Sequence, residues 1–142
     1  MRVSYLSLAI ATKLNNKMKT IIETSNAPAP IGPYSQAVLS GNTLYTSGQI
    51  AINPESGKLI LDSIELETTQ VMDNMKAVLK EAGMNFDHVV KASIFISNMD
   101  DFVQINEVYN QYFTSDYPAR ETVQVARLPK DVNVEISMIA IK

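Results

Sequence analysis

Apolar residues recur along the chain with two different periods, and each period predicts a different kind of element. Between residues 65 and 82 they recur every three or four positions, as on the buried face of a helix. Gly83 follows, and glycine is favoured directly after a helix. A second helix is expected over residues 99–113, with Asn98 suited to cap its first turn. The residues expected to face inward are Val71, Met75, Val78, Leu79 and Ala82 in the first helix, and Phe102, Ile105, Tyr109 and Tyr112 in the second.

Alternation of apolar and polar residues predicts strands elsewhere in the chain. It is cleanest over residues 132–141, where every second residue is apolar. Residues 89–97 are rich in β-branched side chains, and their expected core row is Val90, Ala92, Ile94 and Ile96. The dipeptide Gly41-Asn42 is typical of a tight hairpin turn. The other strands that we expect are 20–23, 36–39, 43–47 and 121–127.

The predicted order is β-β-β-α-β-α-β-β, which is typical of an α+β fold with both helices on one face of the sheet. Residues 27–33 contain three prolines and are expected to form an irregular loop. Phe95, Ile139 and Ile141 alternate out of phase with the main apolar rows, so the uncovered face of the sheet is partly apolar too. Such a face favours burial against a second copy of the chain. Scattered surface apolar residues are the ordinary alternative.

The composition narrows the possible chemistry. The chain has no cysteine, which excludes disulfides, a thiolate nucleophile and sulfur-ligated metals. Its single histidine, His88, excludes the motifs that bind metals through paired histidines. Neither a G-x-S-x-G elbow nor a glycine-rich phosphate loop is present. An enzyme of this composition would work with carboxylates, arginine, hydroxyls and water.

The charge is unevenly distributed along a chain whose length suits one domain. Residues 18–142 contain nine basic and fifteen acidic residues, a net charge of −6, whereas residues 1–17 contain three basic residues and no acidic one. An acidic body disfavours nucleic acid as a partner, because phosphate binding depends on clustered lysine and arginine. No apolar run approaches the roughly 18 residues of a membrane-spanning helix, so we expect no membrane association either.

Residues 1–17 are expected to be a loosely packed leader, followed by a single domain over residues 18–142. Ala9-Ile10-Ala11 is similar to a signal-cleavage triplet, but the apolar stretch before it is short and polar residues follow at once. A secretory signal, an organellar presequence and a true start at Met18 stay open as alternatives. The expected location is the cytoplasm.

Two charged residues stand beside apolar strand residues. Arg120 follows Pro118-Ala119, and a guanidinium at the start of a strand can bind a small carboxylate through two hydrogen bonds. Most such arginines, however, are solvated or paired with a local acid. Glu135 lies between Val134 and Ile136, where a carboxylate can hold water or act as a general base. An exposed strand face explains it equally well.

Other polar residues are weaker candidates. Tyr34 closes the proline-rich loop, and Ser47 and Gly48 end a predicted strand, so these residues can line a pocket or simply form turns. Asn106 interrupts an apolar helix face, either as part of a pocket or as an amide at the boundary of the core. His88 is expected to be a solvated loop residue.

Taken together, these segments resemble the RidA/YjgF family of enamine/imine deaminases, over residues 18–142. The resemblance rests on several ordered motifs at compatible spacing. They are APAPIGPYSQ at 27–36, TSGQI at 46–50, Pro118-Ala119-Arg120, VARLP at 125–129 and Val134-Glu135-Ile136.

The resemblance implies a fold like that of the bacillus chorismate mutase, with a mixed sheet. It also implies a homotrimer with sites in the clefts between subunits. The implied activity is hydrolysis of 2-imino acids, 2-iminobutanoate and 2-iminopropanoate, to 2-oxo acids and ammonia. Such an enzyme clears the products of pyridoxal-phosphate dehydratases and needs neither a metal nor a cofactor.

Residue by residue, the resemblance implies that Arg120 binds the substrate carboxylate and that Glu135 helps to hold the attacking water. The positions implied to line the pocket are Tyr34, Ser47, Gly48, Asn106 and Thr122. Thr122 stands where many members carry cysteine, which leaves deamination intact and puts oxidation-controlled activity in doubt. A non-catalytic ligand-binding or chaperone-like trimer is the alternative function. A ribonuclease or translation inhibitor is a third, disfavoured by the acidic body.

Overall fold

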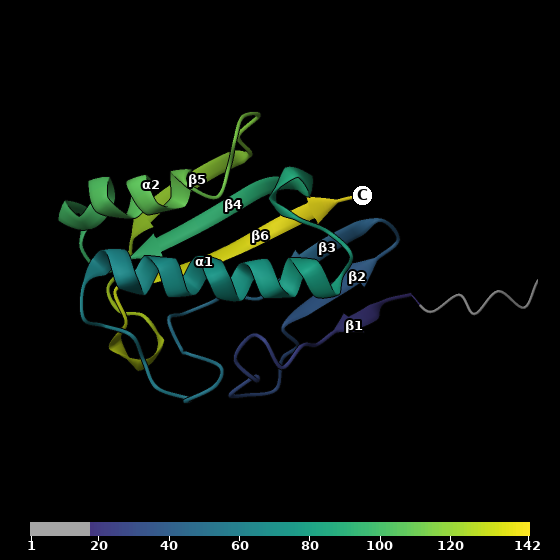
Figure 1. Ribbon diagram of the computed structural model, residues 1–142, viewed down its shortest axis with the longest axis horizontal. Coiled ribbons are helices and arrows are strands. Elements are labelled where there is room, and N and C mark those ends of the chain that lie inside the picture. The colour runs from purple at the N-terminus through teal and green to yellow at the C-terminus, as the bar shows by residue number, and fades with distance from the viewer. Residues whose placement is uncertain (1–17) are drawn as a thin grey trace, which may run out of the picture.

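The computed structural model describes residues 18–142, which form an α+β fold with the predicted order of elements (Figure 1). In chain order the elements are β1 (Thr20–Ile22), β2 (Ala37–Ser40), β3 (Thr43–Thr46), α1 (Ile64–Glu81), β4 (Val89–Ile96), α2 (Phe102–Asn110), β5 (Ala119–Gln124) and β6 (Val134–Ile141). Short 3₁₀ turns lie at Phe86–His88, Met99–Asp101 and Pro129–Asp131. The leader expected at residues 1–17 lies outside the described residues, so its loose packing stays a prediction.

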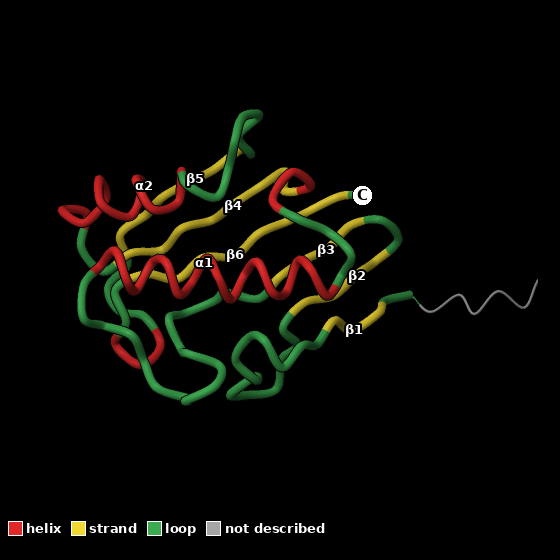
Figure 2. Tube along the Cα trace, in the orientation of Figure 1, coloured by secondary structure: helices red, strands yellow, loops and turns green. Residues whose placement is uncertain are grey.

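The strands of the described chain form one six-stranded sheet in the order β1-β2-β3-β6-β4-β5. All neighbours are antiparallel except β4 and β5, which are parallel and are joined through α2. Both helices pack on the same face of this mixed sheet (Figures 1 and 2), which confirms the predicted fold class. Among residues 18–142, no helix has the length and apolarity needed to cross a bilayer.

The helix predictions are confirmed where the pattern is longest. α1 begins after Ser63, whose hydroxyl accepts a hydrogen bond from the Leu66 amide at 3.2 Å. It ends before Gly83, which adopts the left-handed φ of 71°. The predicted inner row of α1 is buried against the sheet, and each fully buried aliphatic side chain contributes about 1.5–3 kcal/mol. The opposing row on β6 is Val134, Ile136, Met138 and Ala140.

The expected core row of β4 is wrong at its first position. Val89 is only 5% exposed, whereas Val90, which the alternation places in the core, is 44% exposed. The physical reason is a break in the pairing with β6 between Val89 and Lys91, which turns the strand by one residue. From Ala92 onward the predicted row faces the helices.

The boundaries of the last helix and of β5 also differ from the prediction. Asn98 caps the 3₁₀ turn at Met99–Asp101 by accepting a hydrogen bond from the Asp100 amide at 3.0 Å, and α2 starts only after that turn. β5 begins two residues earlier than expected, because residues 119–124 pair in parallel with β4. This extension places Arg120 inside the sheet instead of before it.

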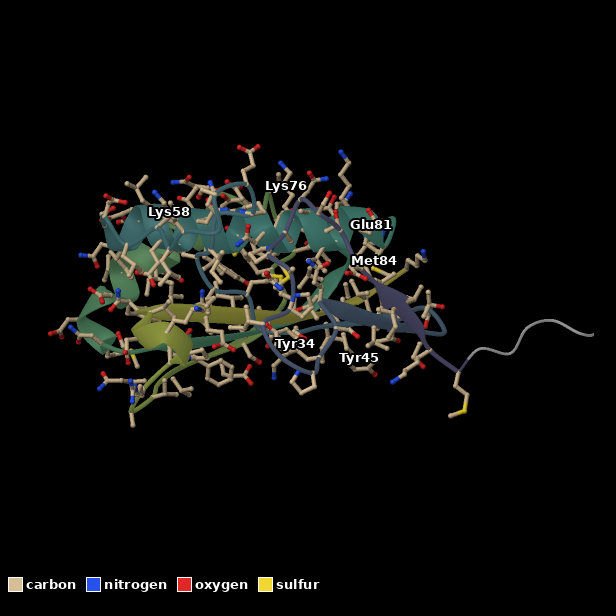
Figure 3. All side chains as sticks on the ribbon, turned by 90° about the horizontal axis from the view of Figure 1, so that it is seen from below. Tyr34, Tyr45, Lys58, Lys76, Glu81 and Met84 are labelled. Carbon is tan, nitrogen blue, oxygen red and sulfur yellow. The ribbon has the colours of Figure 1, made fainter. Side chains whose placement is uncertain are left out.

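The face of the sheet opposite the helices is partly apolar, as predicted. Tyr45, Val123 and Ile141 are 51%, 40% and 41% exposed there. Figure 3 shows Tyr34 and Tyr45 on this side of the sheet, away from α1. We call this surface the open face.

Candidate active site

Arg120 lies on β5, the edge strand next to α2. It pairs with Ala92, whose side chain is buried beneath the helices, so Arg120 projects toward the helical side. Its Nη1 donates a hydrogen bond to Asn106 Oδ1 at 2.6 Å. The neighbouring Glu121 projects to the open face, where Lys91 forms a 3.1 Å ion pair with it and lowers the pKa of the Glu121 carboxyl. Within residues 18–142, Arg120 therefore has no carboxylate partner, which removes pairing with a local acid as an explanation.

The guanidinium faces a hollow of about 410 Å³ between α2 and the segment that leads into β5. We call it the arginine hollow; it is lined by Asn106, Tyr109, Asn110, Tyr117, Pro118 and Arg120. Tyr117 closes one wall by donating a hydrogen bond from its hydroxyl to Asn110 Oδ1 at 2.5 Å. Burial raises the pKa of Tyr109 to about 12, although the Arg120 charge acts in the opposite direction, so this phenol is neutral at physiological pH.

Glu135 lies on β6, an interior strand, and faces a second hollow of about 300 Å³. We call it the glutamate hollow; it is lined by Ile31, Tyr34, Ser47, Gly48, Ile50, Pro129 and Glu135. The carboxyl group is half-buried beside apolar residues. Burial raises its pKa above the usual glutamate range, because the charged form loses solvation there. A carboxyl group of this kind is suited to accept and return a proton.

Gly48 is required for this placement of Glu135. A side chain at residue 48 would overlap the carboxyl group, since its Cβ would come within 2.7 Å of Cδ and 2.8 Å of Cγ of Glu135. Contacts that short do not occur between real side chains, so one of the two residues would have to move. The glycine lets the backbone at residue 48 and the Glu135 carboxyl group lie directly against each other.

The backbone around Gly48 is shaped by a break between β3 and β6. Thr46 Oγ1 accepts a hydrogen bond from the Met138 amide at 2.9 Å, in place of a backbone carbonyl. Beyond the break, Gln49 and Ile136 form an isolated antiparallel bridge by exchanging two backbone hydrogen bonds of 2.8 and 3.1 Å. The break frees Ser47 and Gly48 from the sheet and lets them line the glutamate hollow.

The Ser47 hydroxyl is already engaged within the chain. It donates to the Ser35 carbonyl oxygen at 2.5 Å, and the Ser47 amide donates to the Gln36 carbonyl at 2.9 Å. Both bonds tie the end of β3 to the loop that carries Tyr34. Ser47 thus lines the glutamate hollow with only its acceptor lone pairs left for a ligand, and its role in substrate binding stays a prediction.

Gln36 has a structural role that the sequence pattern did not indicate. Its buried side chain donates to the carbonyls of Thr24 and Pro28 at 3.0 and 2.8 Å and accepts from the Thr24 amide at 2.7 Å. These bonds satisfy backbone groups of the proline-rich loop and hold it against the sheet. Its place in the APAPIGPYSQ motif was visible in the sequence, but its burial was not.

Glu67 on α1 was also missed, because it looks like one of many helix acids. It is fully buried, and its carboxylate accepts hydrogen bonds from the Asn133 amide at 2.7 Å, the Asn133 side chain at 2.8 Å and the Val134 amide at 3.3 Å. These bonds fix the start of β6 immediately before Glu135.

Thr122 shares the face of β5 with Arg120, two residues further along the strand. Its hydroxyl is buried and has no hydrogen-bond partner within residues 18–142, and it lines neither hollow. The described subunit does not by itself bring Thr122 into either hollow.

The candidate residues therefore divide into two groups on opposite faces of the sheet. Arg120 pairs with Ala92 on the helical side, whereas Glu135 pairs with Phe95 on the open face. Asn106 joins Arg120, and Tyr34, Ser47 and Gly48 join Glu135. Among residues 18–142 there is also no cluster of three or more potential metal ligands.

Residues 24–142 match the model of the family described as endoribonuclease L-PSP. The chain belongs to this family, the RidA/YjgF family that its motifs resemble. It is 49% identical to a RutC family protein of Pyrococcus horikoshii over 125 residues, which cover 88% of this chain and 99% of that one. It is 44% identical to the human 2-iminobutanoate/2-iminopropanoate deaminase, with 91% of this chain and 94% of the relative covered.

A solved structure of the same family confirms the fold. The crystal structure of Escherichia coli TdcF with bound serine superposes with a TM-score of 0.84 at 43% identity, covering 87% of this chain and 98% of that one. RidA/YjgF relatives under several names therefore share both the sequence motifs and the architecture described above.

Proposed function

We propose that this RidA/YjgF protein is a deaminase that hydrolyses 2-iminobutanoate and 2-iminopropanoate to 2-oxo acids and ammonia. The observation that carries the proposal is the half-buried Glu135 carboxyl, with its raised pKa, held against Gly48 in a hollow. Arg120 adds a cation that has no carboxylate partner among residues 18–142. Relatives support the proposal, since the human deaminase is 44% identical and TdcF was solved with serine, which shares with a 2-imino acid a carboxylate and a nitrogen on carbon 2.

Arg120 is assigned to bind the substrate carboxylate. One of its nitrogen atoms is engaged by Asn106, and the remaining N–H groups are sufficient for a two-pronged bond to a carboxylate. Two fixed hydrogen bonds orient the plane of the substrate, so that carbon 2 of the imine takes a defined position.

Glu135 is assigned to the water that attacks carbon 2. As the water oxygen bonds to carbon 2 of the protonated imine, the π electrons of the C=N bond move to nitrogen and Glu135 accepts a proton from the water. Glu135 then returns that proton to the amino group of the resulting carbinolamine. The C–N bond breaks with its electron pair leaving on nitrogen as ammonia, and this ammonia takes the hydroxyl proton as the 2-oxo acid forms. The net reaction consumes one iminium acid and one water and yields one 2-oxo acid and one ammonium ion.

The assembly proposed with this activity is a homotrimer whose sites lie between subunits. Arg120 and Glu135 project from opposite faces of one sheet, so a site that uses both needs two copies of the chain. The partly apolar open face beside Glu135 offers a surface that a second copy can cover. In this arrangement the β5 edge of one subunit brings its arginine hollow to the glutamate hollow of the next.

A coupled assay tests the activity. Threonine dehydratase, kept limiting, generates the enamine and imine, and 2-oxobutanoate is followed with and without this protein. The expected result is that the lag before 2-oxobutanoate formation shortens with protein concentration. Glu135→Gln should restore the lag, while Glu23→Gln, which changes an exposed carboxylate outside both hollows, should not. An unchanged lag with the wild-type protein would contradict the proposal.

The family description makes RNA hydrolysis a second candidate. The net charge of −6 over residues 18–142 works against binding a polyanion. The single histidine, His88, is half-buried in the 3₁₀ turn at Phe86–His88, where its Nδ1 accepts a hydrogen bond from the Asn85 amide at 3.1 Å. A labelled single-stranded RNA incubated with wild type and Glu135→Gln separates the two functions, because cleavage lost in the variant would favour the ribonuclease.

A further inference from the structure

The guanidinium of Arg120 is restrained by two kinds of contact before any ligand is bound. Asn106 Oδ1 accepts a hydrogen bond from Nη1 at 2.6 Å. The guanidinium carbon also lies 5.1 Å from the centre of the Tyr109 ring and 5.8 Å from that of the Phe102 ring. Contacts of this length are typical of a cation–π interaction. All three partners belong to α2, whereas Arg120 belongs to the edge strand β5.

The Tyr109 ring is itself firmly held. Tyr109 is 3% exposed, and its ring packs against Phe113 with centroids 4.8 Å apart. Phe113 in turn packs against Phe86 at 5.3 Å, within the main core. The Tyr109 hydroxyl has no hydrogen-bond partner within residues 18–142, so the ring and not the hydroxyl contacts Arg120.

We propose that Asn106 and Tyr109 are positioning residues that hold Arg120 in its carboxylate-binding orientation before the substrate arrives. Asn106 then acts through Arg120 and does not bind the substrate itself, unlike the pocket contact implied by the family resemblance. The inference rests on the proposed function, because it assumes that Arg120 binds a carboxylate.

The neutral side chain of Asn106 is suited to this task. An acidic residue would hold the guanidinium as firmly but would cancel much of its charge. Asparagine supplies one acceptor and leaves the positive charge available to the ligand. An arginine that is already oriented loses less side-chain freedom on binding, so its affinity for a carboxylate is higher.

A double-mutant cycle tests whether Asn106 acts through Arg120. Catalytic efficiency for 2-iminobutanoate is measured for wild type, Asn106→Ala, Arg120→Ala and the double variant. Asn106→Ala should lower it about tenfold, the typical effect of losing a hydrogen bond to a charged group. In the Arg120→Ala background the same change should have little effect. Gln111→Ala, an exposed amide residue on the same helix end, is the matched control. Independent losses that multiply would show that Asn106 contacts the substrate and would overturn the inference.

Paired substitutions at Asn106 and Tyr109 test the roles of the neutral amide and of the aromatic ring. Asn106→Asp should weaken 2-oxobutanoate binding more than Asn106→Ala, measured by calorimetry, although it keeps an acceptor in the same place. Tyr109→Leu should weaken binding more than Tyr109→Phe, because only the phenylalanine retains an aromatic face. The opposite ranking in either pair would contradict the proposed roles.

A readout without any ligand separates this inference from the proposed function. The order parameter S² of the Arg120 side-chain Nε–H bond can be measured by ¹⁵N relaxation. It is expected to exceed about 0.6 in the wild type and to fall below that value in Asn106→Ala. A mobile Arg120 in the wild type would overturn the inference even if the enzyme deaminates imines. Conversely, an ordered Arg120 in a protein without imine hydrolysis would refute the function and leave the restraint standing.

Discussion

The arginine hollow and the glutamate hollow place their charged groups by different means. Arg120 stands on an edge strand, and side chains of α2 hold its long, flexible side chain in position. Glu135 stands on an interior strand, and the backbone of Gly48 and the paired neighbours of β6 confine its short side chain. The first group is held by contacts that a single substitution can remove. The second is held by the geometry of the sheet itself.

This difference predicts how each hollow responds to change. Loosening the arginine hollow should affect binding and orientation while the fold is retained, because Arg120 is exposed and lies at the sheet edge. Disturbing the glutamate hollow should move the backbone of two strands together.

The largest effect is expected from Arg120→Lys, which should lower catalytic efficiency about a hundredfold, the typical loss for misplacement by about 1 Å. Lysine keeps the charge but lacks the planar fork, and its ammonium cannot stack on Tyr109 in the same way. The melting temperature should stay close to that of the wild type. Steady-state kinetics and thermal unfolding check both statements, and an unchanged efficiency would remove Arg120 from the site.

Mixing two inactive variants tests whether the hollows cooperate across subunits. Arg120→Lys and Glu135→Gln proteins are each expected to be poorly active, but after subunits exchange at random about a quarter of the composite sites regain both groups. Activity should therefore recover well above that of either variant. Absence of recovery, with exchange verified by mass spectrometry of the assemblies, would mean that the hollows function separately. Sedimentation as a stable monomer at micromolar concentration would rule out the trimer.

Gly48→Ala should reduce turnover about tenfold or more, because the new methyl group occupies the position of the Glu135 carboxyl. Binding of 2-oxobutanoate through Arg120 should change much less. Calorimetry and kinetics on the same preparation distinguish the two effects. Equal losses of turnover and of 2-oxobutanoate binding would contradict the prediction that the two hollows respond separately.

The pH dependence of turnover sharpens the role of Glu135. The ionised carboxylate is the base, so activity should fall as pH drops through its pKa. Because burial raises that pKa, the fall should begin at a higher pH than the ordinary glutamate value of about 4.3 allows. In Glu135→Gln this fall in turnover at low pH should disappear. If turnover of the variant still falls at low pH, the fall must be caused by the titration of another group.

The smallest effect is expected from removing residues 1–17, because the residues named above for both hollows all lie within 18–142. The free energy of unfolding of a protein that starts at Met18 should be within about 1 kcal/mol of that of the full chain. A larger difference would be easy to detect, because it is a substantial fraction of the total stability of a typical domain. Denaturant titration and the coupled assay are the measurements. A larger loss would show that the leader stabilises the domain.

Much of the fold could be predicted because it depends on short-range patterns. The inner rows of α1 and β6 and the partly apolar open face follow from periods of two or 3.6 residues, and the hairpin follows from its Gly41-Asn42 turn. The prediction was wrong at Val90, where pairing with another strand breaks the alternation. It also placed the start of β5 too late, since pairing with β4 decides where that strand begins.

The elements, the fold class and the charged candidate residues could be predicted from the amino-acid sequence, because each is encoded within a few neighbouring positions or in the motifs shared with the family. Which of these residues meet in space depends on the folded chain. Asn106 reaches Arg120, Gly48 admits Glu135, and Glu67 holds the start of β6 across distances of 14 to 87 residues along the chain. The placement of Arg120 and Glu135 on opposite faces likewise follows from the register of β4 with both neighbours. Register depends on long-range packing, and a local pattern does not contain it.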